Sequence, residues 1–134
     1  MVYRKINKKL IKKFEIDIGV VYFYKNYVIT EINEGVVLNF EKAAKLLQLG
    51  IEYYGTKVPF IYISNRINSY SFEPTSHFKS TEMFPNLKGF GVVIYDQLNS
   101  DVAKIEQTFI NKPTNIFYSL EEAIAWAEEL IIID

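Results

Sequence analysis

Six polar side chains crowd a short segment that follows an apolar run near the middle of the chain. The run VPFIYIS (58–64) has the continuous apolar character of a buried central strand, and the residues NRINSYSFE follow it before Pro74. Loops at the carboxyl ends of strands carry the binding sites of open α/β sheets, and hydroxyls, amides and a guanidinium suit an anion, a ligand or a protein partner there. We therefore predict ligand- or partner-binding residues at Asn65, Arg66, Asn68, Ser69 and Ser71, beside the strand's last residue, Ser64.

The chain offers little for catalysis. It has no Cys, and its single His is His77, three residues after Pro74. His77 could act as a base on a ligand held by the loop, but the simpler expectation is a partly exposed, inert side chain. The acidic pairs 121–122 and 128–129 occupy consecutive helical positions, so their carboxylates diverge, whereas a metal site needs converging ligands. We expect no catalytic residue, no metal and no cofactor.

Each candidate also has a purely structural interpretation. Asn68, Ser69 and Ser71 suit hydrogen bonds to the loop's own backbone. Arg66 suits a salt bridge to Glu73 or to another surface acid. The ten tyrosines fit either an amphipathic ligand cavity or a core built from strand faces that favour aromatic residues.

Composition and charge narrow the class of protein. The 134 residues suit a single domain, the lack of Cys fits a reducing cytoplasm, and no apolar run approaches the roughly 20 residues of a membrane span. Residues 1–14 hold six basic side chains and no acid, against nine basic and 16 acidic residues beyond them. We read 1–13 as a basic N-terminal arm and 14–134 as one domain. Because the rest of the chain is acidic, no nucleic-acid partner is expected.

Hydrophobic periodicity predicts an α/β domain with a mixed sheet of four to five strands and about four helices. An antiparallel hairpin lies within 14–34, with strand 14–25 broken or bulged at Gly19, and the strands 58–64, 87–96 and 115–118 alternate with helices. Such alternation predicts parallel pairing and right-handed crossovers. Strands 58–64 and 88–95 should form the sheet centre.

Four helices follow from caps and apolar stripes. The first is capped by Asn39 and ends at Gly55, and the second begins at Pro74 and ends before Pro85. The third is capped by Asn99 or Ser100, and the fourth begins with the capping box from Ser119 to Glu122. The predicted inward stripe of the first is Phe40, Ala43, Ala44, Leu47, Ile51 and Tyr54, and that of the third is Val102, Ile105 and Phe109.

This layout resembles the STAS domain of sulfate transporters and anti-sigma-factor antagonists, most closely the small stand-alone STAS-like proteins of bacteria. The resemblance covers about residues 14–132 and rests on element order, on the strand–loop–helix unit at 58–74 and on the ending IFYSLEEAIAWAEEL. In antagonist members the equivalent loop reads Asp-Ser-Ser-Gly, and a kinase phosphorylates one serine. The resemblance points to Ser71 as the phospho-acceptor, with Ser69 as the alternative, although no Asp precedes Ser71 and Phe72-Glu73-Pro74 follows it.

Two functions follow. The first is a non-catalytic, cytoplasmic regulatory or protein-interaction domain that acts through the loop after the central strand, with a phospho-switch at Ser71. The alternative is a small amphipathic-ligand binder with a Tyr-lined pocket near residues 64–73. An apolar cavity that reaches Asn65 and Ser71 would favour the ligand binder, and a flat loop beside an exposed apolar patch would favour the interaction domain. The expected partner is a protein or a small ligand, and homodimerisation stays open.

Overall fold

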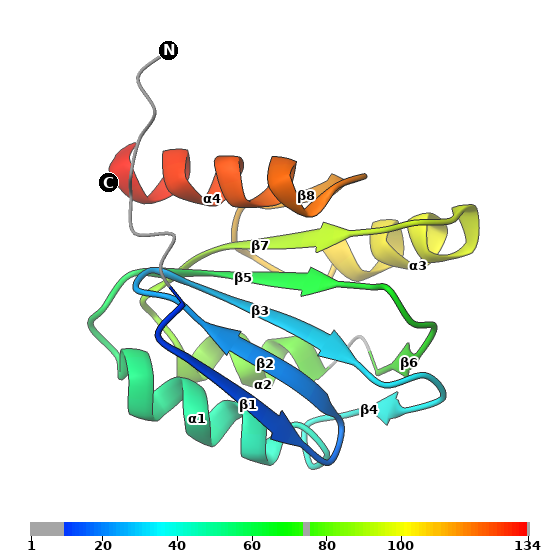
Figure 1. Ribbon diagram of the computed structural model, residues 1–134, viewed down its shortest axis with the longest axis horizontal. Coiled ribbons are helices and arrows are strands. Elements are labelled where there is room, and N and C mark those ends of the chain that lie inside the picture. The colour runs from blue at the N-terminus through cyan, green and yellow to red at the C-terminus, as the bar shows by residue number, and fades with distance from the viewer. Residues whose placement is uncertain (1–9, 74–75, 134) are drawn as a thin grey trace.

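The computed structural model describes residues 10–73 and 76–133, and its centre is a twisted six-stranded sheet (Figure 1). The strands are β1 (Lys12–Ile16), β2 (Gly19–Phe23), β3 (Tyr27–Ile32), β5 (Phe60–Asn65), β7 (Leu87–Val93) and β8 (Thr114–Phe117), in that order across the sheet. The first three pair antiparallel, and β3, β5, β7 and β8 pair in parallel. The predicted mixed sheet is confirmed, and β5 and β7 are neighbours flanked by the hairpin strands and by β8 as expected, but the middle pair of the sheet is β3 and β5 rather than β5 and β7.

The prediction of four to five strands was too low, because residues 12–23 form a complete hairpin rather than one interrupted strand. Gly19 opens β2 instead of bulging a strand. A Cβ atom at Gly19 would stand 2.2 Å from the carbonyl oxygen of Glu31, so only glycine allows β2 to approach β3 there. Lys12 and Lys13, which we assigned to the basic arm, belong to β1, and residues 1–9 of that arm lie outside the described residues.

A second, two-stranded sheet joins the loop after β3 to the loop after β5. Its strands are β4 (Val37–Leu38) and β6 (Ser71–Phe72), which pair in parallel. No sequence pattern predicts this pairing, since each strand has only two residues. Its consequence is that the polar segment 66–73 is held against the neighbouring connection.

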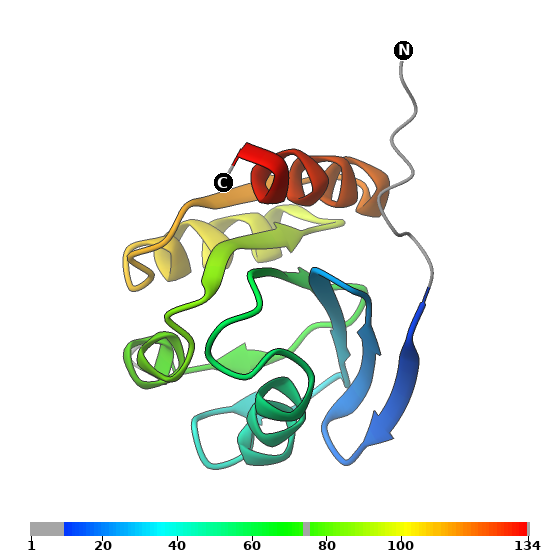
Figure 2. The ribbon, with the colours of Figure 1, turned by 90° about the vertical axis from the view of Figure 1, so that its left-hand side faces the viewer.

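Three helices cover one face of the sheet and the fourth covers the other. They are α1 (Ala44–Tyr54), α2 (Ser76–Met83), α3 (Gln97–Gln107) and α4 (Leu120–Ile133). Each strand–helix–strand crossover steps to the next strand in the same direction, so right-handed connections place α1, α2 and α3 on one side. The sheet curves around α1 and α2, and α4 crosses the opposite side (Figures 1 and 2). No helix in the described ranges is long and apolar enough to cross a bilayer.

The predicted start and inward stripe of the first helix were both displaced. The side-chain oxygen of Asn39 accepts a hydrogen bond from the backbone N–H of Lys42 at 2.8 Å, but the residues between Asn39 and α1 form turns. The helix buries Leu46, Leu49 and Tyr54, and leaves Ile51 39% exposed. Gly55, with φ +56°, ends the helix as predicted.

The third helix is rotated relative to its prediction. It begins at Gln97, so Ser100 lies inside it rather than capping it, and Ile105 is 58% exposed. Among the described side chains of α3, the buried ones are Ser100, Ala103 and Glu106. Our prediction followed the larger apolar side chains and placed the acid in solvent. The predicted first residue of the second helix, Pro74, and the side chain of His77 lie outside the described part of the structure.

The last helix packs closely on the sheet through small side chains. Ala123 and Ala127 are fully buried against β5 and β7, and the hydroxyl of Ser119 accepts a hydrogen bond from the N–H of Glu122 at 3.2 Å. Cβ atoms at Gly89 and Gly91 would stand 3.0 and 3.2 Å from the Trp126 ring. These two glycines therefore let the indole lie directly on β7.

Replacing Ile63 by Ala should lower the free energy of unfolding by about 2–5 kcal/mol, because a fully buried side chain in the central strand loses its contacts and leaves a void. Ile105→Ala makes the same chemical change at an exposed site of α3, and should cost less than about 0.5 kcal/mol. Urea denaturation measures both. A loss below about 1 kcal/mol for Ile63→Ala would contradict the central position of β5.

Candidate functional site

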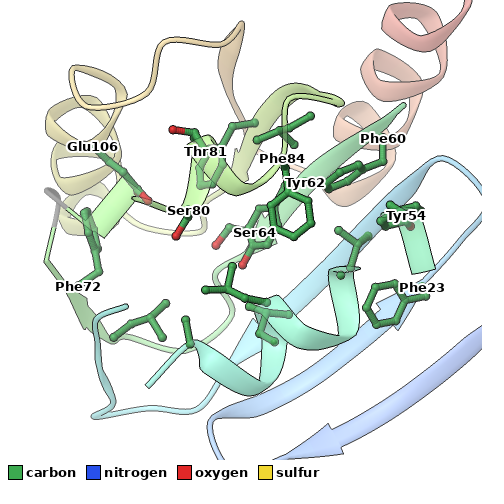
Figure 3. Close-up of a pocket in the computed structure, with 18 of the residues that line it drawn as sticks. Phe23, Tyr54, Phe60, Tyr62, Ser64, Phe72, Ser80, Thr81, Phe84 and Glu106 are labelled. Atoms are coloured by element: carbon green, nitrogen blue, oxygen red, sulfur yellow. The ribbon is translucent and has the colours of Figure 1, made fainter. Parts of the chain in front are cut away.

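A largely apolar cavity of about 110 Å³ lies between the curved sheet and the helices α1 and α2 (Figure 3). Phe23 and Tyr54 stand at one end, and Phe72 and Glu106 stand at the other. The lining residues come from both sheets, from α1, α2 and α3, and from the connecting loops. They are Phe23, Val28, Leu38, Ala43, Leu46, Leu47, Gly50, Tyr54, Phe60, Tyr62, Ser64, Arg66, Tyr70, Phe72, Ser80, Thr81, Phe84, Leu87, Phe90 and Glu106.

Stacked aromatic rings build the walls of the cavity. Tyr54 stacks on Phe60 with ring centroids 4.3 Å apart, and Tyr62 stacks on Phe90 at 5.1 Å. The Tyr54 hydroxyl donates to the backbone carbonyl oxygens of residues 24 and 27, at 2.6 and 2.7 Å, which fixes the orientation of its ring. These walls are rigid, because each ring is held by another ring or by a hydrogen bond.

Gly50 brings α1 close to Phe84, at the end of the α2 segment. A Cβ atom at Gly50 would lie 3.0 Å from the Cζ atom of Phe84, so the ring occupies the space that a side chain would need. Gly50 therefore has a packing role. The structure shows that it receives an aromatic ring from the neighbouring helical segment.

The Glu106 end of the cavity carries a buried polar network. Arg66 donates through Nη2 to the Oε1 of Glu106, and the two side chains are only 2% and 3% exposed. The Nε of Arg66 donates to the hydroxyl of Ser64 at 3.0 Å, and that hydroxyl lies 3.0 Å from the hydroxyl of Tyr70. The guanidinium carbon lies 5.2 Å from the ring centre of Tyr70 and 5.3 Å from that of Phe72. Hydrogen bonds and cation–π contacts together offset the cost of burying the pair.

Burial sets the protonation states in this network. Burial raises the pKa of both Tyr62 and Tyr70, so their phenols are neutral at physiological pH. Burial opposes the charge of Arg66, but Tyr70 and Glu106 more than offset this effect and raise its pKa. The hydroxyl of Tyr62 lies 2.8 Å from that of Thr30. The network thus combines one fixed cation with neutral hydroxyl groups and a carboxylate.

The structure separates two of the predicted site residues. Asn65 and Arg66 are adjacent, so the strand pleat directs their side chains to opposite faces of the sheet. The amide of Asn65 donates to the Oε2 of Glu31 at 3.0 Å and accepts from the hydroxyl of Tyr95 at 2.6 Å, away from the cavity. Arg66 faces the cavity. Its partner is the buried Glu106, which corrects the expected salt bridge to Glu73 or another surface acid.

Loop residues 68–71 lie against the β3–β4 connection. Asn68 donates its side-chain amide to the carbonyl oxygen of Ile32 at 3.1 Å, and the carbonyl of Ser69 accepts from the N–H of Gly35 at 2.9 Å. The N–H of Ser71 donates to the carbonyl of Val36 at 2.9 Å, while the side chains of Ser69 and Ser71 are exposed. The cavity reaches Ser64, Arg66 and Tyr70, but neither Asn65 nor Ser71 lines it, so the criterion that the sequence set for a ligand binder is not met at these two residues.

Sequence reasoning missed Glu106 and Tyr70. One signal for Glu106 was available, since Ala103 and Ile110 stand at helical spacing, three residues before it and four after it, although α3 itself ends at Gln107. An acid centred on an apolar face indicates a buried partner, and Arg66 was the loop's only cation. Nothing in the local sequence distinguished Tyr70 from the other tyrosines.

Comparison with known proteins identifies the fold. The structure matches an uncharacterised protein of the DUF3478 family from Shewanella loihica, described as having a SpoIIAA-like fold, with a TM-score of 0.52 and 11% sequence identity over 95% of this chain and 99% of that one. The chain has the STAS fold. This confirms the predicted resemblance at the level of the fold. No family model and no curated protein matches the chain.

Arg66→Met should lower the free energy of unfolding by about 3–5 kcal/mol, because it leaves the carboxylate of Glu106 buried without its counterion. The double variant Arg66→Met/Glu106→Leu removes both charges and should return to within about 1 kcal/mol of the original protein. Chemical denaturation of the three proteins tests the pair. If the single and the double variant lost the same free energy of unfolding, the unpaired charge would not be the cause. The loss would then come from the changed packing of the side chains.

Proposed function

We propose that this protein is a non-catalytic, STAS-like domain that binds a small amphipathic molecule in the cavity beneath α1 and α2. One observation carries this proposal: a largely apolar, aromatic-walled cavity ends at the buried pair Arg66–Glu106. Apolar walls with a few converging polar groups are typical of small-molecule sites. The apolar part of the ligand lies between the rings, and its polar group meets the network.

The energetic cost of the cavity supports the same function. The cavity leaves part of its apolar lining without packing partners, which destabilises the protein relative to a filled core. A ligand that fills it recovers part of this loss through contacts with the lining. Binding of a ligand in the cavity is therefore energetically favourable. The α4 side of the sheet is closely packed and offers no such gain.

The hydrogen-bond partners favour binding over chemistry. The hydroxyl of Ser64 bonds with Arg66 and Tyr70, and neither is a general base that activates a nucleophile. The network orients its members toward one another and toward the cavity. Its chemical capacity is recognition of a polar group.

Ala43→Leu should weaken the binding of p-cresol, a small amphipathic test ligand, by at least about tenfold. Ala43 is buried and lines the cavity, so the larger side chain occupies ligand space, and it should also raise the free energy of unfolding by about 1–2 kcal/mol. NMR titration measures the affinity and urea denaturation the stability. The matched control is Ala44→Leu, the same change at the adjacent, exposed residue, which should leave p-cresol affinity unchanged. Undiminished affinity in folded Ala43→Leu would exclude this cavity as the site.

A second candidate function, protein interaction through the loop after β5, is favoured by a different observation. Ile67 on this loop and Val37 on β4 are each 52% exposed, and Val37 pairs with Ser71 in the small sheet. Exposed apolar side chains beside serine hydroxyls suit a protein surface whose affinity a phosphate would change. In this alternative Ser71, or Ser69 near it, accepts the phosphate.

Ser71→Asp should change the set of proteins captured from the organism's own cells, because it adds negative charge to this surface and imitates part of a phosphate's effect. Ser71→Ala should capture the same set as the original protein, and Thr108→Asp adds charge at an exposed residue of another region. Quantitative mass spectrometry compares the captured sets, and a thermal melt verifies folding. Identical sets for all four proteins would refute a role for Ser71 in partner binding.

A further inference from the structure

The polar end of the cavity is balanced in charge. Among the residues described as lining it, Arg66 and Glu106 are the only charged ones, and they are bonded to each other. The remaining polar groups at this end include the hydroxyls of Ser64, Tyr62 and Tyr70, all neutral. The site therefore presents donors and acceptors without a net charge.

Because the polar end of the cavity has no net charge, it favours neutral ligands over charged ones. A buried carboxylate or ammonium needs a counterion, and an ion without one is costly to remove from water. A carboxylate that entered this cavity would meet Arg66 but also the like charge of Glu106, whose side chain is 3% exposed and so little screened by solvent. A neutral hydroxyl avoids the cost, and it can both donate and accept hydrogen bonds.

The volume limits the size of the ligand. The cavity measures about 110 Å³ and is partly open to solvent, whereas a closed apolar cavity of about 150 Å³ holds one benzene molecule. A single ring with one polar group is therefore the largest ligand that this space takes, with part of the ring in the opening, and long acyl chains or nucleotides do not fit. The aromatic walls, with Tyr54 on Phe60 and Tyr62 on Phe90, suit a flat ring.

We propose that the ligand is a neutral, hydroxyl-bearing molecule of about the size of a phenol, and that Glu106 is the residue that excludes carboxylates. This inference rests on the proposed ligand-binding function. Glu106 acts on specificity in two ways: it neutralises Arg66, and it repels an anionic ligand. Removal of its charge should convert the cavity into a site for small carboxylates.

The test compares p-cresol with p-toluate, which carries a carboxylate in place of the hydroxyl, at neutral pH by NMR titration. The original protein should bind p-cresol with a dissociation constant of roughly 1 mM or tighter, and p-toluate at least about tenfold more weakly. Glu106→Gln keeps the shape of the side chain and removes its charge, so it should bind p-toluate at least about tenfold more tightly than the original protein does. Arg66→Gln/Glu106→Gln, which removes both charges, should show no such gain.

The outcomes separate this inference from the proposed function. If p-cresol binds but p-toluate binds equally well to the original protein, the charge selection is wrong and the ligand-binding function stands. If neither compound binds the original protein or Glu106→Gln, both the charge selection and the ligand-binding function are refuted. If Glu106→Gln does not fold, the comparison of the two compounds on the original protein still decides whether carboxylates are excluded. A folded Glu106→Gln with unchanged p-toluate affinity would overturn the role of Glu106.

Discussion

The buried ion pair between Arg66 and Glu106 is the interaction on which the site depends. It joins the residue after β5 to α3, and both side chains are almost completely removed from solvent. A buried pair stabilises a structure only when further hydrogen bonds and packing offset its desolvation, and here Ser64, Tyr70 and Phe72 surround the guanidinium. The pair also fixes the rotation of α3, which is why an acid points inward while Ile105 faces solvent.

The two faces of the sheet are packed in different ways. On one face Gly89 and Gly91 let Trp126 lie directly on β7, and α4 fills the surface closely. On the other face large aromatic rings hold α1 and α2 away from the strands, and a cavity is left between the layers. Gly50 brings α1 close to Phe84, which follows α2. Both faces carry a buried hydrophobic cluster, but only the face beneath α1 and α2 leaves a cavity in the part of the chain that the structure describes.

Sequence patterns predicted the elements whose burial follows from simple periodicity. The continuous apolar run at 58–64 predicted the central strand, and the capping box from Ser119 to Glu122 predicted the start of the last helix. The α3 face was wrong because an ion pair between residues 40 positions apart outweighed the larger apolar side chains. The site was predicted in part: Arg66 lines the cavity, whereas the pleat turns Asn65 to the opposite face. Which face is hollow depends on ring packing among distant strands and helices, and no local pattern records it.

A crystal structure of the protein with p-cresol at saturating concentration tests the central claim most directly. The account predicts density for one ring between α1, α2 and the sheet, beside Phe84, with the hydroxyl at the Arg66–Glu106 end of the cavity. The ion pair should be retained, because the ligand brings no charge. The contradictory result is a cavity closed by Phe84 and Leu47, with p-cresol absent or bound only on the outer surface.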